Sequence, residues 1–203
     1  FFLYLPLTSP HTPWLPSPAF AGRSRAGKYG DFVAMTDDAV GKVLRVLEET
    51  RLERNTLVFF ASDNGAYWTP EEIERFGHRA NHFHRGQKSD IWEGGHRVPL
   101  IARWPGMIEP GTATTELACL TDLLATVAGI AGVELPNNAA QDSYSMLPAL
   151  LGTKLSKPVR EAVVHHSGAG HFAIRKGEWK LHPARGSGGF TNPRDYTPKP
   201  GEP

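Results

Sequence analysis

Residues 56–65, with the sequence TLVFFASDNG, constrain the fold of this chain more than any other stretch. The first six residues are almost continuously apolar and rich in β-branched and aromatic side chains. A strand with one exposed face alternates apolar and polar residues, whereas a continuous apolar run is typical of a strand covered on both faces. The stretch therefore predicts a strand of a mostly parallel sheet flanked by helices, which is an α/β fold.

The polar end of this stretch, Ser62-Asp63-Asn64-Gly65, has two interpretations. Ligands bind at the carboxyl ends of strands in open α/β sheets, and an acid beside an amide offers oxygen ligands for a divalent cation. The alternative is a plain turn, because Asp, Asn and Gly are the usual turn residues. Both interpretations stay open on these residues alone.

The composition limits the class of protein. The chain has 203 residues, a net charge of +1 and 40% hydrophobic residues, which is enough for one core with a small appended unit. The near-neutral charge gives no electrostatic case for nucleic acid or an anionic membrane surface. No apolar run approaches the roughly 20 residues that span a bilayer. Cys119 is the only cysteine, which excludes an internal disulfide and a thiolate cluster.

Both ends of the chain indicate an interior piece of a longer protein. The chain begins FFLYLPL, without a starting Met or a basic leader, and it ends in the Pro-rich run TPKPGEP. We therefore draw nothing from the absence of a targeting signal.

Residues 1–7 predict a buried strand, which Pro10 and Pro13 bring to an end because proline cannot pair in a ladder. His11 follows directly, just past the strand end. It is either a hydrogen-bonded loop histidine or a proton donor and anion contact, since histidine changes charge near neutral pH.

The next segment predicts an amphipathic helix that begins at a cap formed by Asp31. Its apolar residues recur at steps of three and four and would lie on the sheet. The strand at 1–7, this helix and the strand at 56–61 form the pattern of a parallel βαβ unit. Asp37 and Asp38 are neighbours that point in different directions on a helix, so we assign them to its solvated face.

A glycine-rich loop surrounds Lys88, with Gly86 before it and Gly94 and Gly95 after it. Glycine permits close approach of a ligand, and a lysine in such a loop can hold an oxyanion as a compact charge. The alternative is an ordinary surface lysine. The histidines that precede this loop lack the spacing of a tight zinc motif, so we interpret them as part of a solvated loop.

The C-terminal half predicts further helices and a small sheet. A short helix is expected near residues 70–76, a strand at 98–104, a helix from a Thr121 cap to Gly132, and a short helix at 146–151. Strands at 162–166, 172–175 and 179–181 predict an antiparallel sheet. We therefore divide the chain into a partial α/β domain, residues 1–151, and a small antiparallel subdomain with a tail, residues 152–203.

Five stretches together resemble a known family. They are FFLYLPLTSPHTPW, DDAVGKVLRVLEETRLERNTLVFFASDNG, RGQKSDIWEGGHRVPLIARWPG, TDLLATVAGIAGVELP and FAIRKGEWKL. In this order, they resemble the middle and C-terminal part of a type I sulfatase, of the arylsulfatase class within the alkaline-phosphatase-like superfamily. The resemblance implies an alkaline-phosphatase-like fold, incomplete here, that hydrolyses sulfate esters of aryl alcohols or carbohydrates.

The resemblance also implies roles for individual residues. Asp63 and Asn64 match calcium ligands, and Lys88 matches the lysine on the sulfate oxygens and the leaving-group oxygen. His11 matches the histidine that contacts the sulfate ester and protonates the leaving oxygen. A cation and a lysine suit the negative charge of a sulfate ester, and a histidine can supply the proton. We also expect His166 to reach the pocket and contact the substrate, with a surface or structural histidine as the alternative.

The match lacks the nucleophile of the family. That nucleophile is a formylglycine made from Cys or Ser in a Cys-x-Pro/Ala-x-Arg motif, but Cys119 is followed by Leu-Thr-Asp-Leu. The upstream aspartates of the calcium site are also absent. We therefore expect the formylglycine in a segment N-terminal to this chain, and no sulfatase activity from these residues alone.

Other assignments compete with a sulfatase. One is a phosphonate or phosphate ester hydrolase of the same superfamily, and another is a binding protein that kept the fold and lost catalysis. The resemblance implies a sulfated small molecule or glycan as substrate and a periplasmic or extracellular location. It does not identify the ester, and the sequence gives no oligomeric state.

Overall fold

A computed structural model describes residues 1–195, and their contacts divide the chain into two compact units. The first contains residues 1–56 and 68–80, and the second contains residues 57–67 and 81 onward. The predicted boundary between residues 151 and 152 lies inside the second unit and stays a prediction.

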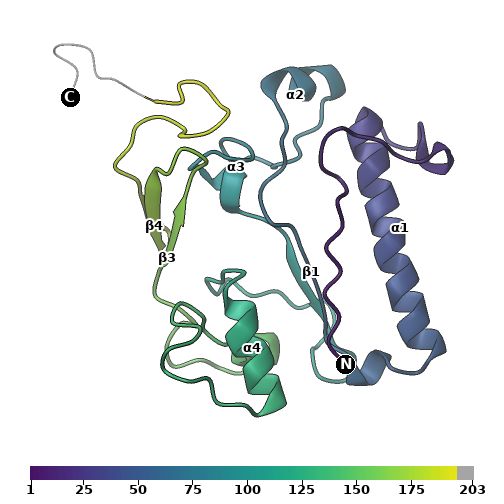
Figure 1. Ribbon diagram of the computed structural model, residues 1–203, viewed down its shortest axis with the longest axis vertical. Helices are drawn as coiled ribbons and strands as arrows, with labels where there is room; N and C mark the ends of the chain where they lie inside the picture. Colours follow the sequence, from purple (N-terminus) through teal and green to yellow (C-terminus); the bar gives the residue numbers. More distant parts are fainter. Residues whose placement is uncertain (196–203) are drawn as a thin grey trace. The chain divides into compact units, whose positions relative to one another are not determined.

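The first unit is organised on a long helix, α1, Gly27–Glu49 (Figure 1). The helix begins before Asp31, so the prediction that Asp31 caps it is wrong. The buried carboxylate of Asp31 instead accepts hydrogen bonds from the amides of Gly22 (2.8 Å) and Ser24 (2.7 Å), which fastens the preceding loop to the helix. Lys42 and Asp38 form an exposed ion pair one turn apart, which confirms the solvated face.

The predicted strand at residues 1–7 is not formed in the structure. Its large apolar side chains are 40–86% exposed, and no strand among residues 1–195 pairs with it. An extended apolar segment becomes a strand only when a neighbour accepts and donates its ladder hydrogen bonds. The peptide bonds before Pro10 and Pro13 are cis.

Three short helices complete the first unit: two 3-10 turns, Pro18–Phe20 and Glu53–Asn55, and α2, Pro70–Phe76. The Thr69 side chain caps α2 by accepting from the Glu72 amide (3.4 Å), and Gly77 ends it in the left-handed conformation. The predicted helix at 70–76 is confirmed.

The second unit begins with β1, Val58–Ala61, which pairs antiparallel with β2, Leu100–Arg103. Every ladder within residues 1–195 is antiparallel, so the predicted parallel arrangement is not confirmed and the βαβ unit is not formed. The apolar run correctly indicated a strand. However, the four residues of β1 are only half-buried, and an apolar run does not set the direction of the neighbouring strand.

Two helices of the second unit lie near their predicted positions. They are α4, Asp122–Ala131, which Gly132 ends at φ 65°, and α5, Leu147–Leu150. The Thr121 side chain makes no cap hydrogen bond, because its hydroxyl donates to the Asp142 carbonyl. The Asp122 carboxylate instead accepts from the Cys119 amide (2.7 Å).

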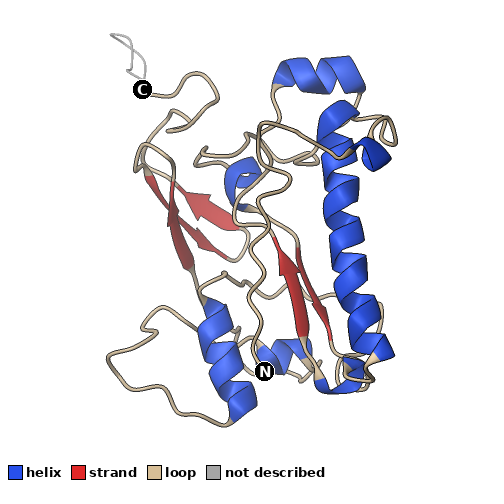
Figure 2. Cartoon of the chain, turned by 45° about the vertical axis from the view of Figure 1, so that its right-hand side comes forward, coloured by secondary structure: helices blue, strands red, loops and turns tan. Residues whose placement is uncertain are grey.

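The predicted C-terminal sheet is confirmed as three antiparallel strands in the order β3-β4-β5 (Figure 2). They are β3, Val163–His166, β4, Phe172–Lys176, and β5, Trp179–Leu181. Ala173 of this sheet joins Ile91 and Trp92 in a small buried cluster. None of the helices described in residues 1–195 is long and apolar enough to cross a membrane.

Candidate functional site

The polar end of β1 forms a compact turn that carries Asp63 and Asn64. The Ser62 hydroxyl donates to the Asn64 carbonyl (2.8 Å), and the Asn64 side-chain amide donates to the Gly65 carbonyl (3.1 Å). Asp63 is exposed and Asn64 is half-buried. Within residues 1–195, the Asp63 carboxylate accepts no hydrogen bond. The stretch is therefore a turn, as one interpretation predicted, and it leaves side-chain oxygens available.

Gly65 places this turn directly against the short helix α3, Glu93–His96, which contains Gly94 and Gly95. The Gly65 amide donates to the Gly95 carbonyl (3.0 Å), and a Cβ on Gly65 would lie only 1.7 Å from the Gly94 carbonyl oxygen. No side chain fits in that space, so the two backbones make direct contact. The turn after β1 and the segment Glu93-Gly94-Gly95, called the EGG segment below, therefore pack directly against each other.

Lys88 belongs to the same structure through its backbone. Its amide donates to the Ala66 carbonyl (3.1 Å), two residues after Asn64. Its side chain is half-buried, and among residues 1–195 the ammonium has no hydrogen-bond or ion-pair partner. A lysine amine without an acidic partner can accept an anionic ligand.

Asn81 holds the two segments together, a role that no pattern in the sequence indicates. Its side-chain oxygen accepts from the Ala66 amide (2.8 Å), and its side-chain nitrogen donates to the carbonyls of Ala66 (2.9 Å) and Gly86 (3.4 Å). One amide side chain thus bridges the turn after β1 and the start of the Lys88 loop.

Asp90 closes the turn on which Lys88 sits. It is fully buried, and its carboxylate accepts from the amides of Gln87 (2.9 Å) and Thr191 (3.0 Å) and from the Thr191 hydroxyl. Ser89, between Lys88 and Asp90, has a φ of 77°. Hydrogen bonds to a carboxylate are stronger than neutral ones, so Asp90 fixes the backbone that presents Lys88.

Two glycine-rich loops from the C-terminal part pack on this turn. The Gly168 amide donates to the Ser89 carbonyl (2.8 Å), and the Ile91 amide donates to the Ser187 carbonyl (2.7 Å). A Cβ on Gly189 would lie 2.5 Å from the Ser89 carbonyl. The loops at 167–170 and 186–191 therefore help to fix the Lys88 turn, although the sequence indicated only that they were loops.

His166 lies at the end of β3, just before the loop that contacts Ser89. The side chain is exposed, and its Nδ1 is 2.9 Å from the Ser167 carbonyl oxygen. A carbonyl only accepts, so Nδ1 carries the proton in this contact. A substrate contact by His166 stays a prediction.

His11 belongs to the first unit, whereas the other candidate residues belong to the second. It is exposed, and its Nδ1 donates to the Thr12 carbonyl (2.6 Å), which leaves Nε2 as the outward ring nitrogen. The predicted role of His11 as a contact of the sulfate ester and a proton donor stays a prediction.

Asp63 and Asn64 fit part of a calcium site. Calcium binds six to eight oxygen atoms from carboxylates, amides, carbonyls and water, and these two residues offer oxygen donors on one turn. Residues 1–195 contain no group of three or more His, Cys, Asp or Glu side chains placed to hold a metal ion. The turn can therefore supply some of the ligands, and the others must come from elsewhere.

Glu93 of the EGG segment has a structural role. Its carboxylate binds Lys180 (3.0 Å) and Arg175 (3.1 Å) and so joins α3, Glu93–His96, to strands β4 and β5. Burial opposes ionisation, but the hydrogen bond from Lys180 and the charges of Lys180 and Arg175 outweigh it, so the pKa of Glu93 is lowered. A carboxylate bound in this way is not free for chemistry.

The rings of His96 and His165 lie beside this ion pair, with centroids 4.2 Å apart and ring planes tilted by 48° to each other. Their Nε2 atoms are buried without a hydrogen-bond partner. Burial, and then the positive charge of Lys180, lower the pKa of each ring to about 4. Both histidines are therefore neutral at pH 7.

Comparison with known proteins gives consistent matches. The sequence model of the sulfatase family matches residues 1–133. The chain is 40% identical to the steryl-sulfatase of Rattus norvegicus over 185 residues, which covers 90% of the chain and 31% of the relative. It is 37% identical to the N-acetylgalactosamine-6-sulfatase of Canis lupus familiaris, over 90% of the chain and 34% of the relative.

A solved structure also matches, one titled for glycosaminoglycan metabolism by Bacteroides thetaiotaomicron. Its TM-score is 0.80 at 33% identity, and the match covers 89% of this chain and 38% of the other. The chain thus spans about a third of the length of the curated relatives that it matches.

Proposed function

Because the chain belongs to the sulfatase family, we propose that the whole protein hydrolyses sulfate esters and that this chain supplies Asp63, Asn64, Lys88 and His11 to the site. The reaction adds water across the ester, so that an alcohol and inorganic sulfate leave. The relatives named above support a sterol or an amino sugar as the kind of group that carries the sulfate.

The observation that carries the proposal is the contact between two segments distant in sequence. The Asp63–Asn64 turn and the Lys88 loop are joined by hydrogen bonds from Gly65 to Gly95 and from Lys88 to Ala66. A buried carboxylate, Asp90, and two glycine-rich loops fix the Lys88 backbone. The backbone contact between the two segments supports a shared site for the Lys88 ammonium and the side-chain oxygens of Asp63 and Asn64, and such a set of charges suits electrostatic stabilisation of a reacting anion.

Each residue has a role that follows from its chemistry. The Lys88 ammonium binds the sulfate oxygens and stabilises the charge that develops on the leaving oxygen. His11, protonated on Nε2, gives a proton to that oxygen, while its Nδ1 stays bonded to the Thr12 carbonyl. The proton leaves with the alcohol.

Asp63 and Asn64 would hold calcium, which when bound would supply positive charge that stabilises the anionic sulfate group. We propose a formylglycine, in a segment outside these residues, as the nucleophile of the whole protein. Cys119 does not take this role, because the residues that follow it, Leu-Thr-Asp-Leu, do not match the family motif. Residues 1–203 alone are then inactive. We also propose a periplasmic or extracellular location.

Turnover by the whole protein tests this proposal. We expect a higher kcat/KM for 4-nitrophenyl sulfate than for 4-nitrophenyl phosphate, and a loss of activity on chelation that calcium restores. Lys88→Ala should lower kcat/KM for the sulfate by about 10–100-fold, the loss typical of a transition-state charge contact.

Lys176→Ala is the matched control, because the Lys176 ammonium forms an exposed ion pair with Glu161 in the same unit and has no other side-chain partner among residues 1–195. A preference for the phosphate ester would support the phosphohydrolase alternative. No turnover of either ester by the intact protein would support a binding protein.

A further inference from the structure

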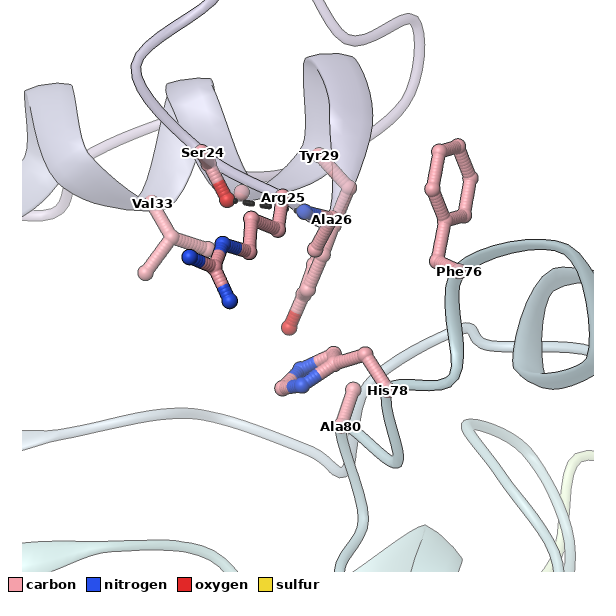
Figure 3. Close-up of a pocket in the computed structure, with 9 residues that line it drawn as sticks. Ser24, Arg25, Ala26, Tyr29, Val33, Phe76, His78 and Ala80 are labelled. Carbon is pink, nitrogen blue, oxygen red and sulfur yellow. Dashed lines mark hydrogen bonds between the residues drawn. The ribbon is translucent and has the colours of Figure 1, made fainter.

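The first unit contains a cavity of about 310 Å³ between the start of α1 and the segment after α2 (Figure 3). None of the predicted site residues lines it. Its volume is at the lower end of the roughly 300–1,000 Å³ range of ligand pockets, so it suits a ligand with a single ring.

Three polar side chains point into the same space in Figure 3: the guanidinium of Arg25, the hydroxyl of Tyr29 and the imidazole of His78. In the part of the chain that the structure describes, neither the guanidinium nor the hydroxyl has a hydrogen-bond partner. Burial raises the pKa of Tyr29, so its hydroxyl keeps its proton and can donate. The three groups together offer donors to an anion.

The wall of the cavity belongs to an aromatic cluster centred on Trp68, which is only 3% exposed. Its ring contacts those of Tyr29 (4.7 Å between centroids), Phe76 (5.8 Å), His78 (5.8 Å) and Trp14 (5.9 Å). The Trp68 indole also donates to the His78 carbonyl (2.8 Å). These contacts hold Tyr29, Phe76 and His78 in place before any ligand binds.

Two glycines of α1 give the cavity its shape. Gly27 has a φ of 62°, and a Cβ there would lie 2.7 Å from the Phe76 ring. A Cβ on Gly30 would lie 1.9 Å from the Ser24 hydroxyl. Glycine at both positions therefore lets the start of α1 approach Phe76 and the preceding loop.

The charge of the lining is positive. Residues 22–30 contain Arg23, Arg25 and Lys28 and no acid, and no acidic side chain lines the described cavity. The carboxylate of the nearby Asp31 is bonded to the amides of Gly22 and Ser24. The rest of the lining includes the apolar side chains of Val33, Phe76 and Ala80.

We propose that this cavity binds a small anion carried on an apolar ring, either a carboxylate or a sulfate group. Arg25 pairs with the anion, Tyr29 and His78 donate to it, and the ring lies against the apolar part of the lining. The proposal does not depend on ester hydrolysis, because binding alone defines it.

Titration followed by NMR chemical shifts tests the proposal, with benzoate as the probe. Benzyl alcohol has the ring without the charge, and inorganic sulfate has the charge without the ring. Benzoate should bind at least about tenfold more tightly than either, with shifts at residues 24–33 and 76–80. Arg25→Gln should weaken benzoate binding by about tenfold, as for a lost charged hydrogen bond, and Tyr29→Phe by less.

Arg45→Gln is the matched control, because Arg45 lies on α1 away from the cavity, and it should leave benzoate binding unchanged. Equal binding of benzoate and benzyl alcohol would overturn the proposal, as would equal effects of the two arginine variants. Loss of benzoate binding in Lys88→Ala but not in Arg25→Gln would also overturn it, and would leave the proposed hydrolase function standing.

Discussion

Gly65→Ala should destabilise the second unit strongly, because it inserts a methyl group between two backbones. The new Cβ would lie 1.7 Å from the Gly94 carbonyl oxygen and 2.7 Å from its carbon. Real Cβ atoms essentially never come within 3.0 Å of another heavy atom, so one of the two backbones must move by more than about 1 Å. A flexible side chain could turn aside, but a backbone carbonyl in a packed loop cannot.

The cost has two parts. Overpacking in a filled site typically costs about 1–3 kcal/mol. The same movement breaks the hydrogen bond from Gly65 to Gly95 (3.0 Å), which is worth about 1 kcal/mol. We therefore expect the free energy of unfolding to fall by about 3 kcal/mol, measured by urea unfolding followed by circular dichroism.

Gly129→Ala is the matched control in the same unit. Gly129 is exposed inside α4, and its nearest neighbour would be the Ser145 hydroxyl at an ordinary 3.4 Å. Alanine favours a helix over glycine by up to about 1 kcal/mol, so this variant should be slightly stabilised. If the free energy of unfolding of Gly65→Ala is within about 0.5 kcal/mol of that of the unsubstituted protein, the two backbones are not in direct contact.

Two further predictions concern stability. Asp90→Asn should lower the free energy of unfolding by about 2–4 kcal/mol. The reason is that the new amide nitrogen cannot accept the hydrogen bond that Gln87 or Thr191 donates to the carboxylate. The control is Asp37→Asn at an exposed position, which should change the free energy of unfolding by less than about 0.5 kcal/mol. Equal effects in urea unfolding would refute the role of Asp90. His96 and His165 titrate near pH 4 when folded and near 6.5 when unfolded. The unfolded chain therefore binds more protons in that window, and stability should fall as the pH drops from about 6.5 to 4, by about 1–2 kcal/mol for the pair after allowance for solvent screening. Changing both to Gln should flatten this part of a melting-temperature profile, and an unchanged slope would count against the assignment.

Local signals predicted the local structure well. A short helix is expected near residues 70–76, and α2 forms there with a Thr69 cap, a first-turn proline and Gly77 at its end. The three strands at the C-terminus follow from apolar runs separated by Lys176-Gly177 and by a glycine-rich loop. Signals of this kind depend on contacts between neighbours in the chain.

Strand direction and distant contacts could not be predicted in this way. The apolar runs at 1–7 and 56–61 looked alike, but only the second is paired, with a strand that runs in the opposite direction. Asp31 had the sequence of a cap, but its carboxylate bonds to the loop before the helix. The pattern of apolar residues in a segment indicates which residues are buried. The direction of a strand and the identity of its partner depend on where other segments of the chain pack.

The candidate site shows the same limit. The sequence and its family resemblance single out Asp63, Asn64 and Lys88 as candidate site residues, and the structure joins their two segments through the backbone. The residues that fix this arrangement, Asn81 and Asp90, were not identified. Their roles depend on bonds to Ala66 and Thr191, which no spacing in the sequence reveals.

The most direct test of a single site at Asp63 and Lys88 is a double-mutant cycle on the whole protein. We would measure kcat/KM for 4-nitrophenyl sulfate in Asp63→Ala, in Lys88→Ala and in the double variant. Residues that act as one unit give strongly non-additive losses. We predict a fall of at least about tenfold in each single variant and little further loss in the double variant. Unchanged kcat/KM in either single variant, or losses that simply multiply, would contradict a shared site.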